Sequence, residues 1–96
     1  MTNQAGPAVD GDKPYRIRFN RTLEPVKVML VNRKNKLPHT QWLDFVELTR
    51  SSIISRPEEY LGRELPSREI LSRVVDGIFA DFLRVEGESM ERKTGY

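Results

Sequence analysis

The stretch SREILSRVVDGIFADFLRVE, residues 67–86, decides how the rest of this chain must fold. Its apolar residues come in adjacent pairs that repeat every four positions: Ile70/Leu71, Val74/Val75, Ile78/Phe79 and Phe82/Leu83. Because residues four apart lie on one face of a helix, this spacing predicts a long amphipathic helix over residues 67–86. Ser67 is its expected N-cap, and Gly87 is its expected end.

The apolar arc of this helix is unusually wide. At 100° per residue, the apolar positions sweep about 220° around the helix axis. Either this arc is the centre of a three-sided core, or part of it contacts another molecule. A homodimer formed through residues 67–86 is one expected form of that contact, since small domains often gain stability by association.

Two further helical segments are predicted upstream of it. Residues 39–54 place five residues at the i, i+3, i+4, i+7, i+11 spacing of one helical face: Trp42, Phe45, Val46, Thr49 and Ile53. The segment Ser55-Arg56-Pro57-Glu58 has the form of a capping box. It predicts a short helical turn that is anchored by Tyr60 and Leu61 and ended by Gly62.

The pattern changes near the N-terminus to one that is typical of β-strands. Tyr15-Arg16-Ile17-Arg18-Phe19 alternates apolar and basic residues, and Val26–Val31 (VKVMLV) is apolar and rich in β-branched residues. A six-residue connection that ends in Pro25 joins them. We therefore predict an antiparallel β-hairpin over residues 15–31, with Arg16, Arg18 and Lys27 on its outer face.

Together these elements predict an α+β fold in the order β-β-α-short α-α. A basic antiparallel β-hairpin packs against two main helices, because a hairpin alone is only marginally stable in water. A chain of 96 residues forms one domain. We expect a flexible leader over residues 1–14, a single α+β domain over residues 15–86, and a flexible tail over residues 87–96.

Charge is unevenly distributed along the chain. Residues 13–36 hold eight basic residues and one acidic residue, a net charge of +7, although the whole chain carries only +2. Cations gathered on one face of a hairpin are suited to nucleic acid phosphates. The predicted contact set is Arg16, Arg18, Arg21, Lys27, Arg33, Lys34 and Lys36. An acidic protein surface is an alternative partner for the same residues, and charges that only keep a strand edge soluble are a third interpretation.

The main alternative function is that of a protein–protein interaction module, such as an adaptor or an inhibitor of a larger protein. Exposed faces of Trp42, Phe79 or Phe82 are its expected hot spots, because aromatic residues dominate such interfaces. A helix-turn-helix over residues 55–75 fits poorly. The position six residues after Gly62 is normally apolar in that motif, but here it is Arg68.

No pattern in the sequence indicates catalysis. The chain has no cysteine, which excludes disulfides, thiolate catalysis and Cys-based zinc sites. Its one histidine, His39, cannot build a His-based metal site alone, and no phosphate-binding glycine loop is present. We predict that the protein is not an enzyme and binds no cofactor or metal. No apolar run approaches the ~18 residues that span a bilayer, so we expect no membrane partner and a cytoplasmic location.

Overall fold

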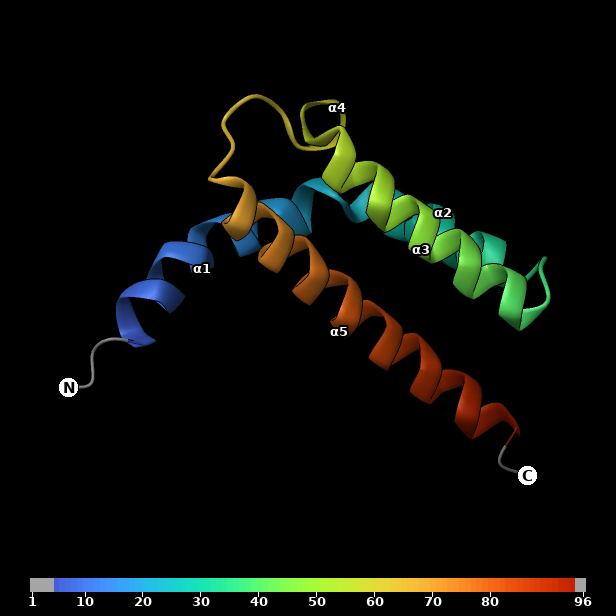
Figure 1. Ribbon diagram of the computed structural model, residues 1–96. Coiled ribbons are helices and arrows are strands. Elements are labelled where there is room, and N and C mark those ends of the chain that lie inside the picture. The colour runs from blue at the N-terminus through green and yellow to red at the C-terminus, as the bar shows by residue number, and fades with distance from the viewer. Residues whose placement is uncertain (1–4, 95–96) are drawn as a thin grey trace.

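The computed structural model describes residues 5–94 of the chain and the side chains of residues 12–86. Every secondary-structure element in that range is a helix, and the described residues contain no strand (Figure 1). The elements are α1 (Ala5–Thr22), α2 (Glu24–Lys34), α3 (His39–Ser55), α4 (Pro57–Leu61) and α5 (Arg68–Thr94). The predicted α+β fold and its basic β-hairpin are therefore wrong.

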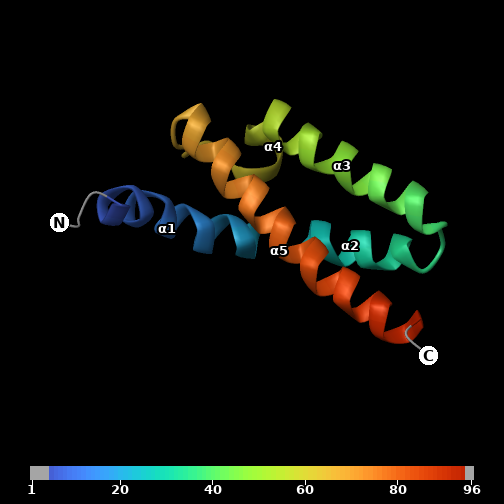
Figure 2. The ribbon, with the colours of Figure 1, turned by 60° about the horizontal axis from the view of Figure 1, so that its bottom comes forward.

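The helices are arranged as two thin layers. In Figure 1, α1 and α2 follow one another, and α3 returns alongside α2 in the opposite direction. Figure 2 shows that α5 crosses over this layer, where it packs against α1 and α3. The molecule measures 47 × 33 × 18 Å, so its shortest dimension accommodates two helices of about 10 Å diameter.

The predicted long helix is confirmed as the centre of the core. Five of its apolar residues, from Leu71 to Phe79, are at most 3% exposed, and they pack against buried side chains of the other helices. Ile70, Phe82 and Leu83 lie half-buried at the ends of the stripe. The buried hydrophobic residues described outside α5 are Phe19, Leu23, Leu30, Trp42, Val46, Ile53 and Leu61.

Helical spacing explains why residues 15–31 are not strands. Tyr15, Phe19 and Leu23 are four residues apart, so one helical face presents all three to α5 and its neighbours. Phe19 and Leu23 are fully buried, whereas Ile17, which strand alternation placed on the same apolar face, is 56% exposed. Pro25 lies in the first turn of α2, where a missing N–H leaves no helical hydrogen bond unmade.

The three downstream helices match the sequence prediction in extent, with differences at their ends. Helix α3 runs from His39 to Ser55, and α4 ends at Gly62, whose φ of 90° ends the helix at little cost. The capping box is wrong, because α4 has no side-chain cap hydrogen bond. The Ser67 cap is confirmed, since its Oγ accepts a hydrogen bond of 3.4 Å from the Ile70 amide. Gly87 does not end α5, which continues to Thr94.

Helical backbone also enters both ranges that were predicted to be flexible. Helix α1 begins at Ala5 and α5 ends at Thr94. Residues 1–4 and 95–96 of the predicted leader and tail lie outside the described residues. The division of the chain into leader, domain and tail stays a prediction.

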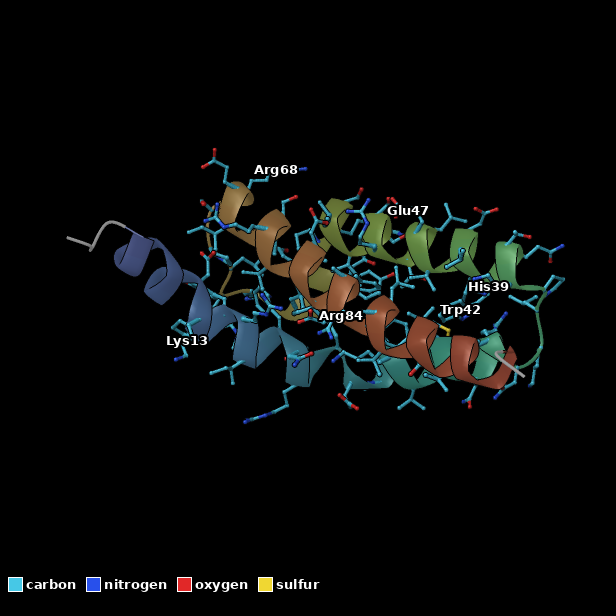
Figure 3. All side chains as sticks on the ribbon, turned by 90° about the horizontal axis from the view of Figure 1, so that it is seen from below. Lys13, His39, Trp42, Glu47, Arg68 and Arg84 are labelled. Atoms are coloured by element: carbon cyan, nitrogen blue, oxygen red, sulfur yellow. The ribbon has the colours of Figure 1, made fainter. Side chains whose placement is uncertain are left out.

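Trp42 joins three helices at the middle of the structure. It is fully buried, and its indole Nε1 donates a hydrogen bond of 2.7 Å to the backbone oxygen of Leu30 in α2. Its ring lies 6.1 Å from the ring of Phe82 in α5. Figure 3 shows Trp42 pointing inward, in contrast to Glu47 on the outer side of α3. The hydrogen bond from Trp42 to Leu30 links α3 directly to α2.

Candidate functional site

Two of the three predicted cations of α1 bind the chain's own acidic and carbonyl groups. Arg16 Nη2 lies 2.5 Å from Asp81 Oδ2 in α5. Arg18 donates to the backbone oxygen of Glu64, in the loop before α5, and lies 3.7 Å from the carboxylate of that residue. The two arginines therefore reach different elements and do not share an outer face.

Two cations of α2 are held in the same way. Lys34 Nζ lies 2.5 Å from Glu86 Oε1, and both side chains are at most 20% exposed. Lys27 donates to the Asn20 side chain and lies 3.9 Å from Glu24. Four of the seven predicted contact residues thus neutralise carboxylates or satisfy polar groups within the chain.

The other three predicted residues have no ion pair among the side chains that the structure describes. They are Arg21 at the end of α1, Arg33 in the last turn of α2, and Lys36 in the turn between α2 and α3. Arg21 and Lys36 stand at opposite ends of α2, which is about 16 Å long. The structure does not gather the predicted set into one basic surface.

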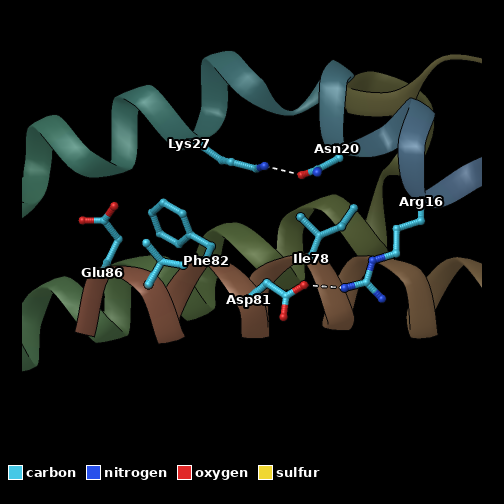
Figure 4. Close-up of a pocket in the computed structure, with 8 residues that line it drawn as sticks. Arg16, Asn20, Lys27, Ile78, Asp81, Phe82 and Glu86 are labelled. Atoms are coloured by element: carbon cyan, nitrogen blue, oxygen red, sulfur yellow. Dashed lines mark hydrogen bonds and ion pairs between the residues drawn. The ribbon is translucent and has the colours of Figure 1, made fainter. Parts of the chain in front are cut away.

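A cavity of about 240 Å³ lies between α1, α2 and α5 (Figure 4). Ile78, Phe82 and Val85 form its apolar part. Its rim is charged and balanced, with two cations and two carboxylates: Arg16, Lys27, Asp81 and Glu86. The dashed contacts of Figure 4 join Arg16 to Asp81 and Lys27 to Asn20, so these polar groups link α1 to α5 and to α2.

A second hollow, of about 280 Å³, lies between α2 and α3, and it has a different character. No charged side chain lines it. Its lining residues come from α2, α3 and the short α4: Val26, Met29, Phe45, Leu48, Thr49, Ser52 and Tyr60. We call this hollow the α2–α3 groove. Of the lining residues, Leu48 has 65% of its surface exposed, the highest value among the large hydrophobic residues described.

The two ends of the α2–α3 groove differ. At the end nearer the turn between α2 and α3, the Arg33 guanidinium lies 5.2 Å from the centre of the Phe45 ring. At the other end, Val26 and Tyr60 close the groove. The seven steps along the helix from Val26 to Arg33 span about 10 Å, which equals two helical turns.

Charges of α3 are concentrated on the flank away from this groove. There Arg50 pairs with Glu47 on its own helix and, at 2.6 Å, with Asp76 of α5. The hydrogen bond that Arg50 donates to the Glu47 carboxylate is the largest cause that raises the pKa of Arg50 above its ordinary value. On the groove flank, the Thr49 hydroxyl donates to the Phe45 backbone oxygen at 2.9 Å, so it offers no free donor there.

The residues that mark the groove were not identified from the sequence. The predicted aromatic hot spots Trp42 and Phe79 are 0% and 3% exposed, and Phe82 is half-buried beside the cavity of Figure 4. Leu48 lies outside the buried stripe of α3 but shares a helical flank with Phe45, three residues earlier. That i, i+3 pair is the only sequence signal that indicates the groove.

No protein family matches the chain, and neither a curated protein nor a solved structure shows a significant similarity to it. Among the described residues, no helix combines the length and apolar composition that a membrane span requires. Within the same range, no three His, Asp or Glu side chains are placed to hold a metal ion. The fold and the groove define a small, all-helical protein with an uncharged apolar groove between two of its helices.

Proposed function

We propose that this protein is a non-enzymatic protein-binding module that acts in the cytoplasm as an adaptor or an inhibitor of a larger protein. Its docking surface is the α2–α3 groove. The observation that carries this proposal is the exposure of Leu48, 65%, next to a groove without a charged lining residue. Water contact at such an apolar surface is unfavourable, and a protein partner removes it.

Charge favours a protein partner over nucleic acid at this surface. Charged residues make up 31% of the chain, yet none lines the groove. Depletion of charge at the centre is the compositional mark of a protein–protein interface. Phosphate binding instead requires several free cations together, and four of the seven predicted ones are engaged within the chain.

The shape of the groove favours an amphipathic helix as the ligand. A groove about two turns long receives apolar side chains at positions i, i+4 and i+7 of a docked helix. Leu48 then packs beside that helix at the centre of the contact, where truncation of a side chain costs most.

A matched pair of variants tests this proposal. Leu48→Glu places a charge on the groove, whereas Ile17→Glu places one on α1 at a residue of similar exposure, 56%. We expect immobilised wild type and Ile17→Glu to capture the same proteins from a lysate, and Leu48→Glu to lose them. Equal capture by Leu48→Glu contradicts the proposal. Loss of capture after nuclease treatment indicates nucleic acid binding instead.

A further inference from the structure

We infer that the α2–α3 groove is occupied by a second copy of this chain, in a two-fold dimer that pairs α3 with its counterpart in antiparallel orientation. This inference rests on the proposed function, because it concerns the same docking surface: a second copy covers the groove in the free protein, and a larger protein competes with it for the groove. It moves the predicted homodimer contact from α5 to α3. Three observations carry it: the exposed area, the self-complementary shape, and the charges at the two ends of the groove.

The chain exposes more surface than a compact monomer of its mass. Its accessible surface is 6650 Å². A compact monomer of 11.2 kDa is expected to expose about 5,700 Å². The excess is about 1,000 Å², and one partner in a standard protein interface contributes about 800 Å². The molecule is also flat, 18 Å in its shortest dimension, and a flat shape exposes more surface for its mass than a rounded one. Pairing of two copies buries a comparable area.

The α2–α3 groove has both a projecting apolar side chain and an apolar hollow that can receive one. Leu48 projects from α3, and the hollow that adjoins it is formed by Val26, Met29 and Tyr60. In a two-fold dimer, the same patch contacts itself, so each copy inserts its Leu48 into the hollow of the other. The small side chain of Ser52, one turn after Leu48 on the same flank, lets the two α3 helices approach closely.

The charges near the groove ends complement one another in the antiparallel orientation. Arg33 and Lys36 lie at the end near the turn between α2 and α3, and neither has an ion pair among the described side chains. At the other end, α4 carries Glu58 and Glu59, both exposed; Glu59 lies 3.8 Å from Arg56, whereas Glu58 has no ion pair among the described side chains. A two-fold axis near Leu48 brings Arg33 and Lys36 of each copy toward Glu58 of the other, which favours this orientation.

Sedimentation of the full chain tests the dimer. We expect wild type and Ile17→Glu to be dimeric in a concentration-dependent manner. Leu48→Glu is expected to raise the dissociation constant at least about 30-fold, the effect of losing an interface hot spot. A wild type that stays monomeric at every concentration, or a Leu48→Glu variant that dimerises as wild type does, overturns the inference.

Charge reversal tests the antiparallel orientation separately. Arg33→Glu and Glu58→Arg are each expected to weaken the dimer, because each places like charges opposite one another. The double variant Arg33→Glu/Glu58→Arg is expected to restore the wild-type dissociation constant. A double variant that dimerises no better than the two single variants overturns the proposed pairing. Circular dichroism of each variant shows that the helices are retained.

These outcomes also separate the inference from the proposed function. If wild type is monomeric but Leu48→Glu loses a protein that Ile17→Glu still captures, the groove binds a different protein. The second copy is then wrong as the occupant, while the proposed function stands. If Leu48→Glu changes neither sedimentation nor capture, both proposals fail.

Discussion

Trp42→Phe tests how α2, α3 and α5 are held together. Trp42 is fully buried, and its Nε1 donates to the Leu30 backbone oxygen at 2.7 Å. Phenylalanine keeps an apolar ring at this position but has no N–H donor. The substitution therefore removes the hydrogen bond between α3 and α2 and leaves space around a smaller ring.

The expected loss of stability follows from these two effects. A buried hydrogen bond contributes about 1 kcal/mol net. The lost ring volume adds roughly 1–2 kcal/mol, from reduced apolar burial and the cavity left behind. The free energy of unfolding should thus fall by about 2–3 kcal/mol. A chain of this length has a total of about 5–14 kcal/mol, so the variant still folds.

Urea unfolding followed by far-ultraviolet circular dichroism measures this change. Fluorescence is unsuitable, because Trp42 is the chain's one tryptophan. With a urea dependence of about 1–1.5 kcal/mol per molar, the midpoint should fall by about 2 M. Leu43→Ala, at a 38% exposed neighbour on the same helix, is the control and should lose less than about 1 kcal/mol. A Trp42→Phe midpoint equal to that of the control refutes the reasoning.

Two further predictions concern the packing of α1 against α5. Gly77→Ala should raise the free energy of unfolding by about 0.5 kcal/mol, because a gain of about 1 kcal/mol in helix propensity exceeds the loss of an exposed ion pair. The added Cβ meets only the flexible end of Arg16, at 2.9 Å, and a lower urea midpoint contradicts this prediction. A hydrogen bond from Arg73 lowers the pKa of Asp12 below its ordinary value of 3.8. The resulting stability is present above pH 3.8 and is lost as pH falls through the lowered pKa, so Asp12→Asn should flatten the acid dependence of the urea midpoint. An unchanged acid dependence in Asp12→Asn shows that this pair does not contribute.

The long helical patterns of the sequence were sufficient to predict α3 and α5. The paired apolar residues of α5 repeat over four turns, and no strand can bury both members of each pair on one face. Tyr15–Phe19, in contrast, is a five-residue pattern that fits either period. The segment is helical because a helix buries both Phe19 and Leu23 against the other helices, and β-propensity is weak compared with such tertiary packing.

Basic residues are concentrated in residues 13–36, but the local sequence does not show which of them form ion pairs within the chain. Arg16 and Asp81 pair across 65 positions of sequence, and Lys34 and Glu86 across 52. Only the fold brings these groups together, so the excess of cations in residues 13–36 says little about the free charge at the surface. The exposure of Leu48 likewise depends on which flank of α3 the other helices leave uncovered.

Cysteine cross-linking at the centre of the groove tests the α3 pairing most directly. The chain has no cysteine, so Ser52→Cys and Ser51→Cys each introduce a single thiol. Position 52 lines the groove, whereas position 51 is exposed and lies about 100° around the same helix. A two-fold axis near Leu48 places the two thiols of Ser52→Cys about 12 Å apart along the helices, too far for a disulfide but within reach of a long bis-maleimide. Such a reagent should link Ser52→Cys into dimers faster than Ser51→Cys. Equal rates, or faster linkage at position 51, contradict the account.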